Sequence, residues 1–404
     1  MAEVTIERLG HKGDGIAAGP IFVPRTLPGE VVKGDIDGQI IPKPAIQTPS
    51  DHRIKAPCSH YSSCGGCSLQ HAHDDFVSNW KKEVVQSALA SRGIERAVDA
   101  IHTSPAQSRR RAKLTGKRTK SGALVGFHGR ASHTVLAVPN CKILHPDLLS
   151  VIPVLEQLTV EYGSRKGEVE FTVTVTNTGI DLDVAGAKPA GPQEQAALAQ
   201  LTVQHGVVRL TWNGELLAME TPPQLTMGKA AVSPPSGAFL QATEHGQLAL
   251  EAFIINNIVG AAKVADLFAG CGTFSLPMAA HAAVHAVEGE ADMIDALAKG
   301  WRMASGLHSV TTEARDLFRR PLMPDELRKF DVVVLDPPRA GAEAQVQEII
   351  ESEVRKVVMI SCSPVTFARD AEALTKAGFS LEKLEVVDQF RWSHHVEVAS
   401  VLTR

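Results

Sequence analysis

Apolar and polar positions alternate differently in three successive parts of the chain. Over residues 4 to about 37, short β-branched runs separated by glycines predict several short strands. Residues 168–185 alternate on both sides of a glycine and predict an antiparallel hairpin, and a second strand pair is expected over 207–220. Further along, apolar runs that no longer alternate predict strands buried on both faces, at 263–268, 283–288, 330–336 and 356–361.

These patterns predict a multidomain α/β protein. Helical stretches between the last strands indicate a doubly wound, Rossmann-like fold over residues 236–404. The opening strands, residues 1–48, suit a small barrel of the oligonucleotide-binding type, although any small β-module would give the same pattern. Residues 49–235 then form a central α+β domain. Apolar residues near a 3.6 period predict a helix over 74–92, which is expected to pack on the last domain.

Charge is distributed unevenly along the sequence. The chain has 404 residues and a net charge of −4, which excludes a uniformly basic nucleic-acid binder. Between Asp99 and Asp147, however, there is no acidic residue, which favours a phosphate-binding face over an ordinary solvated surface. The basic residues in this window are Arg109, Arg110, Arg111, Lys113, Lys117, Arg118, Lys120, Arg130 and Lys142.

Cysteine usage points to an intracellular protein with a metal site. Six cysteines in a chain of this length do not indicate a disulfide-stapled secreted domain, and neither a signal peptide nor a membrane-spanning run is apparent. The expected setting is the cytoplasm, without membrane association. Three cysteines lie within ten residues, and a later one can complete a four-thiolate site for an iron–sulfur cluster or a structural zinc ion. These are Cys58, Cys64, Cys67 and Cys141.

A cofactor loop is predicted where the first buried strand ends. Residues 266–275, Asp-Leu-Phe-Ala-Gly-Cys-Gly-Thr-Phe-Ser, let the backbone approach a ligand at a helix N-terminus through Gly270 and Gly272. Glu288 ends the next strand, where a carboxylate can accept hydrogen bonds from ribose hydroxyls. A dinucleotide-dependent oxidoreductase would share these features, although Ser275 replaces its usual third glycine.

The fourth buried strand favours a methyltransferase over an oxidoreductase. It ends in Asp336-Pro-Pro-Arg339, an arrangement typical of enzymes that methylate nucleobases with S-adenosylmethionine. Asp316 follows the third strand, within reach of an adenine ring. Because the carboxyl ends of parallel strands meet at one edge, Asp266, Glu288 and Asp336 are expected to converge there.

A candidate nucleophile follows the fifth strand. Cys362 precedes Ser363 and Pro364 at the start of a helix, where the dipole is expected to lower the pKa of the thiol. A thiolate that adds to carbon 6 of a pyrimidine makes carbon 5 nucleophilic toward a methyl donor, and a base then removes the carbon 5 proton. By spacing alone that base can be His394, His395 or Glu397.

Together these residues resemble the bacterial RNA 5-methyluridine methyltransferase family, over nearly the whole chain. The resemblance rests on residues 13–15 and 22–30 near the start, the four cysteines, Arg109 to Lys113, Phe239-Leu-Gln241, the Asp-Pro-Pro-Arg edge, Cys362 and Glu397. It implies an RNA-binding TRAM domain at the start and a [4Fe–4S] cluster, as in the ribosomal-RNA branch of the family. Ribosomal RNA is then the expected substrate and transfer RNA the alternative.

The resemblance also implies roles for individual residues. Cys362 matches the nucleophile and Glu397 the base, and Arg109, Arg110, Arg111 and Lys113 match a basic strand near the RNA. The implied cofactor-binding residues are Gln241, Phe268, Gly270, Gly272, Thr273, Glu288, Asp316 and Asp336. Two positions depart from the family pattern, since Thr273 and Ser363 both stand where asparagine is common.

Three other functions are compatible with these motifs. Cytosine-5 methylation shares the thiolate chemistry, and a non-catalytic RNA-binding protein with a metal site would share the basic segment and the cysteines. An oxidoreductase would bind a nicotinamide cofactor. The chain is expected to act as a monomer.

Overall fold

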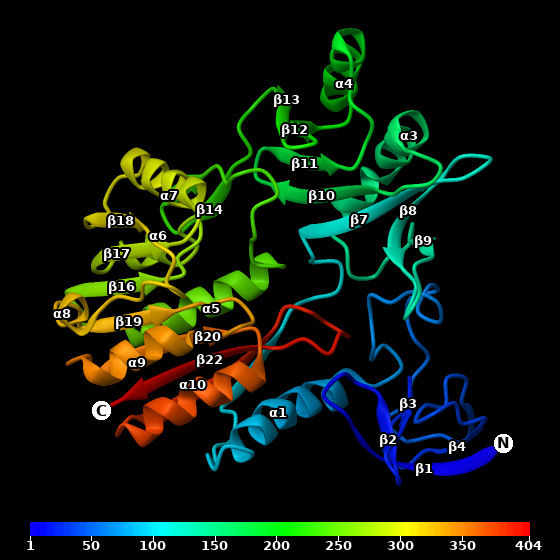
Figure 1. Ribbon diagram of the computed structural model, residues 1–404, viewed down its shortest axis with the longest axis horizontal. Coiled ribbons are helices and arrows are strands. Elements are labelled where there is room, and N and C mark those ends of the chain that lie inside the picture. Colours follow the sequence, from blue (N-terminus) through cyan, green and yellow to red (C-terminus); the bar gives the residue numbers. More distant parts are fainter.

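A computed structural model describes all residues, 1–404, and shows three units (Figure 1). The first is a five-stranded antiparallel sheet in the order β3-β2-β1-β4-β5. Whether this sheet acts as an RNA-binding barrel stays a prediction. Its strands are β1 (Ala2–Leu9), β2 (Gly15–Ala17), β3 (Ile21–Val23), β4 (Val31–Gly34) and β5 (Ala45–Thr48).

The second unit is a seven-stranded sheet in the order β13-β12-β11-β10-β7-β8-β9. The expected hairpin is β10–β11 and the expected second pair is β12–β13. One parallel pair, β11–β12, is joined by helix α4. The strands are β7 (Arg111–Arg118), β8 (Ala123–His128), β9 (Val135–Ala137), β10 (Val169–Thr176), β11 (Gly179–Ala185), β12 (Val207–Trp212) and β13 (Glu215–Met219), and the helices are α2 (Pro146–Ser150), α3 (Ile152–Tyr162) and α4 (Pro192–Gln204). A separate hairpin, β14 (Leu225–Met227) and β15 (Ala230–Val232), leads into the third unit.

The third unit is built on an eight-stranded sheet in the order β18-β17-β16-β19-β20-β22-β21-β6. The first five are parallel, and β22 runs antiparallel between β20 and β21. The strands are β16 (Lys263–Leu267), β17 (Ala283–Glu288), β18 (Val310–Ala314), β19 (Val332–Leu335), β20 (Lys356–Ser361), β21 (Ser380–Asp388), β22 (Glu397–Thr403) and β6 (Ala100–Thr103).

Helices cover both faces of this sheet, which is why its strands are apolar on both sides. Along β19, Val332 and Val334 join one buried cluster while Val333 and Leu335 join the other. The helices are α5 (Glu244–Asn257), α6 (Ser275–Met278), α7 (Ala291–Met303), α8 (Pro324–Leu327), α9 (Glu343–Glu351) and α10 (Pro364–Lys376). No helix is long and apolar enough to cross a membrane.

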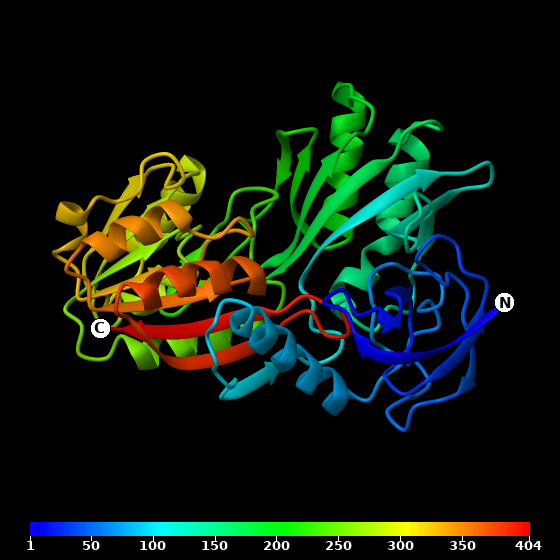
Figure 2. The same cartoon turned by 60° about the horizontal axis from the view of Figure 1, so that its bottom comes forward.

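Two elements from early in the chain belong to this third unit. Helix α1 (Asp74–Ala90) packs against α10, with Val85 and Leu89 in the same buried cluster as Leu374 (Figure 2). Its other face packs on the first unit through Val77 and Trp80. Strand β6 then adds to the open edge of the sheet beside β21. Residues 74–103 thus connect the first unit to the eight-stranded sheet.

Candidate active site

The loop after β16 has the backbone geometry of a ligand cradle. Phe268, Gly270 and Gly272 have positive φ values of 66°, 56° and 95°. A Cβ at Gly272 would lie 2.7 Å from Cγ of Leu297 in α7, so only glycine fits between the loop and that helix. The loop therefore passes close under α7 and keeps its backbone at the carboxyl edge of the sheet.

The Glu288 carboxylate fixes this loop. Its Oε2 accepts a hydrogen bond from the Gly270 N–H at 2.9 Å, and its Oε1 accepts one from the Gly289 N–H at 2.6 Å. Oε1 also accepts a hydrogen bond from the Glu290 N–H at 3.1 Å, so Oε2 is the oxygen with acceptor capacity left for a hydroxyl donor. The position at the end of β17 matches the expectation for a ribose-binding carboxylate, and the role itself stays a prediction.

Buried carboxylates converge at the same edge. Burial is the largest cause that raises the pKa of Asp266 and that of Asp336 to about 7 each, and the neighbouring Glu288 carboxylate contributes to both. The Ser275 hydroxyl donates to Oδ2 of Asp266 at 2.5 Å, while Oδ1 of Asp266 has no partner. Such a concentration of negative charge favours a cationic ligand.

Asp316 is placed differently from the other predicted cofactor residues. Its Oδ1 accepts a hydrogen bond from the Phe318 N–H at 3.0 Å, so it caps its own turn after β18. Phe318 was not expected from the sequence. Its ring is 48% exposed and lies 5.4 Å from the ring of Phe268, so the two aromatic faces flank the cofactor loop. Thr273 is half-buried in the same loop and hydrogen-bonds Cys271.

Cys362 and Glu397 meet because β22 is antiparallel to β20. Ser361 pairs with Val398, so the residue after β20 lies beside the first residue of β22. Burial and the nearby Glu397 and Asp336 carboxylates raise the pKa of the Cys362 thiol to about 11. The expectation that the α10 dipole lowers this pKa is therefore wrong, because desolvation and two acidic neighbours outweigh the helix terminus.

Glu397 is the buried carboxyl group next to the thiol. It is 3% exposed, and burial together with Asp336 raises its pKa well above the ordinary value. The histidines on the same loop are partly exposed and lie toward the rim. His395 contacts the Arg339 guanidinium at 3.2 Å, and burial with adjacent positive charge lowers the pKa of His395 to about 4. A histidine held neutral in this way contributes an uncharged ring.

Gln241 hydrogen-bonds both Asp336 and Gln389, a glutamine that the sequence did not single out. The Gln241 Nε2 donates to Oδ2 of Asp336 at 3.4 Å, and its Oε1 accepts from Nε2 of Gln389 at 2.5 Å. Gln389 follows β21, whose end lies at the same sheet edge as Cys362. Both glutamines are buried, at 5% and 3% exposure.

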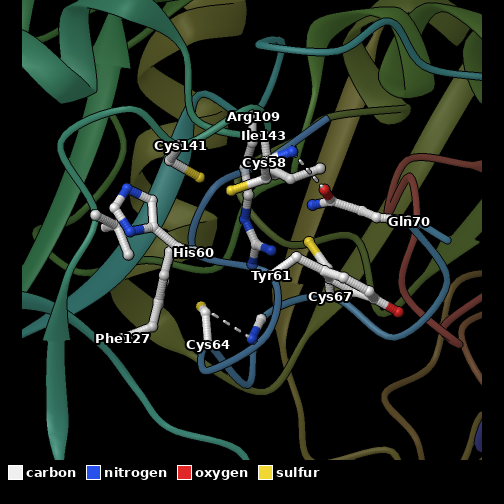
Figure 3. Close-up of a pocket in the computed structure, with 12 residues that line it drawn as sticks. Cys58, His60, Tyr61, Cys64, Cys67, Gln70, Arg109, Phe127, Cys141 and Ile143 are labelled. Atoms are coloured by element: carbon white, nitrogen blue, oxygen red, sulfur yellow. Dashed lines mark hydrogen bonds between the residues drawn. The ribbon is translucent and has the colours of Figure 1, made fainter. Parts of the chain in front are cut away.

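The four clustered cysteines line one cavity of about 50 Å³, between the segment over residues 58–70 and the second unit (Figure 3). None is in a disulfide, and the Cys64 Sγ accepts a hydrogen bond from the Gly66 N–H at 3.4 Å. No three His, Cys, Asp or Glu side chains come close enough together to hold a single metal ion. Cys58, Cys64, Cys67 and Cys141 nevertheless all face this one space.

The basic segment divides between the interior and the surface. Arg110 is 8% exposed and donates hydrogen bonds to the Gln241 carbonyl and to Oε1 of Gln247. Arg109 lines the cysteine cavity, and Nη2 of Arg111 donates to the Gly237 carbonyl at 2.8 Å. Lys113 is exposed on β7. The Arg110 guanidinium is therefore occupied by hydrogen bonds inside the protein, and its burial argues against the predicted contact with RNA.

Comparison with known proteins places the chain in a family. Residues 261–404 match the model of the tRNA (uracil-5-)-methyltransferase family. An RNA methyltransferase of Rhizobium meliloti (strain 1021) is 40% identical over 99% of both chains. The 23S rRNA (uracil(1939)-C(5))-methyltransferase of Halomonas elongata is 33% identical over 98% of this chain and 88% of its own.

This chain belongs to the RNA uracil-C5 methyltransferase family. Its members are S-adenosylmethionine-dependent enzymes, so the edge that carries Cys362 and Glu397 lies in a methyltransferase. The tRNA (uracil-54, C5)-methyltransferase of Pyrococcus abyssi, solved with S-adenosyl-L-homocysteine, has the same fold, with a TM-score of 0.79 over 99% of both chains at 19% identity.

Proposed function

We propose that this enzyme methylates carbon 5 of a uridine in RNA through a covalent adduct with Cys362. The observation that carries the proposal is the meeting of a thiol, a buried carboxyl group and Asp336 at the sheet edge next to the cofactor loop. Methylation at carbon 5 of a pyrimidine needs three groups: a nucleophile for carbon 6, a base for the carbon 5 proton and a polar group to orient the ring.

Cys362 loses its proton to solvent, its sulfur adds to carbon 6 of the uracil, and the electron pair of the carbon 5–carbon 6 double bond moves toward the carbonyl oxygen as an enolate. When bound, S-adenosylmethionine would supply carbon 5 with the methyl group of its sulfonium and would leave as the neutral thioether S-adenosylhomocysteine. Glu397 removes the carbon 5 proton, the double bond re-forms and the Cys362 thiolate leaves. Asp336 and Gln241 hold the ring by hydrogen bonds.

Binding of the methyl donor is assigned to the cofactor loop. The backbone of Gly270, Gly272 and Thr273 approaches the ligand. Glu288 accepts hydrogen bonds from the ribose hydroxyls. The rings of Phe268 and Phe318 cover the adenine. Asp316 is the proposed partner of the adenine ring, and the hydrogen bond that its Oδ1 accepts from the Phe318 N–H holds this carboxylate in the turn after β18. The carboxylates Asp266 and Asp336 favour a donor that carries a positive charge.

Ribosomal RNA is the proposed substrate. The 33% identical relative from Halomonas elongata is a 23S rRNA methyltransferase by name. The four cysteines also resemble the cluster ligands of the ribosomal-RNA branch of the family. Transfer RNA and 5-methylcytidine formation are the alternative outcomes of the tests below. The first unit, residues 1–48, is proposed as a TRAM-like RNA-binding module. Residues 236–404 are the proposed methyltransferase domain, to which α1 and β6 of the central region 49–235 add. Lys113 is the proposed contact of β7 with the RNA backbone.

The cysteine cavity is assigned to a [4Fe–4S] cluster, with structural zinc as the alternative. Both groups take four thiolate ligands, and the resemblance of the four cysteines to the ribosomal-RNA branch of the family favours the cluster. Cys58, Cys64, Cys67 and Cys141 would hold it, and it would link the segment over residues 58–67 to the second unit.

The decisive experiment traps the adduct. Glu397→Gln should stall after methyl transfer, because the amide cannot take the carbon 5 proton, and a covalent RNA–protein band should accumulate on a denaturing gel. Exposed Glu353→Gln should behave as wild type, and adding Cys362→Ala to Glu397→Gln should abolish the band. Nucleoside digestion of the wild-type product identifies the base, and a Glu397→Gln protein that forms no adduct while the wild type methylates would refute the base assignment.

A further inference from the structure

We propose that Gln389 is a positioning residue, whose amide holds Gln241 and Glu397 in the orientations that uridine methylation needs. The inference rests on the proposed function and adds a residue for which no family motif gave a role. Gln389 directly follows β21, is 3% exposed and lies where the sheet edge meets the segment before α5. A buried amide needs hydrogen-bond partners, and the partners of Gln389 show what it does at that place.

The hydrogen bonds of Gln389 have a defined direction. The Ala242 N–H donates to Oε1 of Gln389 at 2.8 Å. Because a backbone N–H is only a donor, Oε1 must be the oxygen, and Nε2 must face the other way. Nε2 in turn donates to Oε1 of Gln241 at 2.5 Å. The orientation of the Gln389 amide is therefore set by the backbone.

This direction passes on to Gln241. Since Oε1 of Gln241 is the acceptor from Gln389, the Gln241 amide nitrogen must face the other side, and it donates to Oδ2 of Asp336 at 3.4 Å. One backbone N–H thus fixes two successive amides and the donor presented to Asp336. Without Gln389, Gln241 could flip its amide and present oxygen to the Asp336 carboxyl group.

The Gln389 amide also lies beside the proposed base. Val387, two residues before Gln389, pairs with Glu397 across β21 and β22, so Gln389 and Glu397 share one end of this strand pair. The amide lowers the pKa of Glu397 against the burial that raises it. The charged and titratable groups around Glu397 are Asp336 after β19, which raises the pKa, Arg339, which lowers it, and the Cys362 thiol. Gln389 is the uncharged donor among them.

The backbone of Gln389 is held from both sides. Lys81 of α1 is fully buried, and its Nζ donates to Oδ1 of Asp388 at 2.5 Å and to the Phe390 carbonyl at 3.2 Å. A Cβ at Gly246 of α5 would come within 2.7 Å of Cβ of Gln389, so the side chain has no room to move toward that helix. The amide is thus positioned before substrate arrives.

The test compares Gln389→Met with Gln345→Met. Methionine keeps the length of the side chain and removes the amide. Gln345 is the matched control, because it is 1% exposed and its amide bonds the backbone of Leu322 at 2.8 and 3.1 Å in a place remote from Cys362. Measurements are kcat and KM for RNA, the pH–rate profile and the fraction of covalent adduct on a denaturing gel.

For Gln389→Met we expect kcat at pH 7 to fall about tenfold with little change in KM, as for loss of an interaction made during the reaction. The adduct should accumulate, since proton removal slows while thiol addition continues. The acid limb of the pH–rate profile should move to higher pH, because a Glu397 without its donor holds its proton more tightly. Gln345→Met should change none of these.

Other outcomes separate this inference from the proposed function. If Gln389→Met matches Gln345→Met in kcat, adduct and pH profile, Gln389 has no positioning role although the reaction stands. If Glu397→Gln and wild type form no adduct at all, the covalent mechanism itself fails. Should Gln389→Met not fold, Gln389→Glu keeps the acceptor for Ala242 and removes the donor, and it must show the same accumulation and the same shift toward higher pH.

Discussion

At the scale of single residues, the active site is arranged at the expense of stability. The carboxyl groups of Asp266, Glu288 and Asp336 lie near one another, and the pKa of Asp336 is raised to about 7. A carboxyl group whose folded pKa exceeds its unfolded value destabilises the protein as pH rises through that range. The ligand-free enzyme therefore carries a charge cluster that a positively charged methyl donor relieves.

Asp336→Asn should accordingly stabilise the ligand-free protein while abolishing methyl transfer. The stabilising effect should be fully developed at pH 8, above the folded pKa, and smaller at pH 5, where the native Asp336 is already protonated. We expect the midpoint of thermal unfolding at pH 8 to rise by about 2–6 °C. Thermal scans at the two pH values measure this, and an equal or opposite change at pH 5 would contradict it.

The resting thiol raises a related point. With its pKa raised to about 11, the Cys362 thiol keeps its proton at pH 7.5 in the resting enzyme. Addition to carbon 6 therefore requires one of two things. Either the thiol proton leaves as the sulfur–carbon bond forms, or binding of RNA and S-adenosylmethionine changes the charge around Cys362 and lowers the pKa of its thiol. Arg339 is the positive group that lowers this pKa, and it lies at the rim beside His395.

At the scale of elements, β7 and the residue before it show that neighbouring basic residues can have different roles. Arg110 precedes Ala112 and Leu114 in steps of two, and all three are buried on the same side. Lys113 points the other way and is exposed. The alternation of a strand thus sends neighbouring cations to opposite sides, one to the protein interior and one to solvent.

Substitutions at these two positions should therefore act on different properties. Arg110→Met leaves the Gln241 carbonyl and the Gln247 side chain unpaired and should destabilise the fold by about 1–3 kcal/mol in urea unfolding. Lys113→Gln should leave unfolding unchanged and reduce the slope of RNA affinity against salt by about 1. Weakened RNA binding with normal stability in Arg110→Met would reverse this assignment.

The sequence predicted elements better than it predicted contacts. Runs such as residues 332–335 identified buried strands because both faces are apolar, and the turn after β20 identified Cys362. Gln389 escaped notice because its partner Gln241 lies 148 residues away and no local pattern marks either contact. The sequence did contain a signal for the burial of Arg110. It lies two residues before the apolar Ala112 and therefore on the same side of the strand. Counting basic residues alone concealed that signal.

At the scale of the whole molecule, the cysteine segment touches the loop that leads to Glu397. The N–H groups of Ser68 and Leu69 donate to the Trp392 carbonyl at 2.8 and 2.9 Å, immediately after Cys67. Asp74 binds Nε1 of Trp392 at 3.0 Å. The segment after the proposed cluster ligand Cys67 is therefore hydrogen-bonded directly to the loop that leads to the proposed base.

Loss of the proposed cluster should loosen that loop. Cys67→Ser protein should lack the visible absorbance of an iron–sulfur centre, and amide hydrogen exchange over residues 388–396 should become faster by about tenfold or more. Cys271→Ser, outside the cysteine cavity, is the control and should keep both properties. Unchanged exchange in a Cys67→Ser protein that has lost its absorbance would show the two regions to be independent.

Strand β6 has a consequence for how the chain is made. Ala100 pairs with Glu385, so the edge of the eight-stranded sheet is synthesised about 285 residues before its neighbour. At ordinary translation speeds that interval lasts on the order of 15–60 s. Throughout it, the apolar side of α1 that ends against α10 has no partner. The nascent enzyme must be shielded from aggregation until its last strands leave the ribosome, the machine whose RNA we propose it modifies.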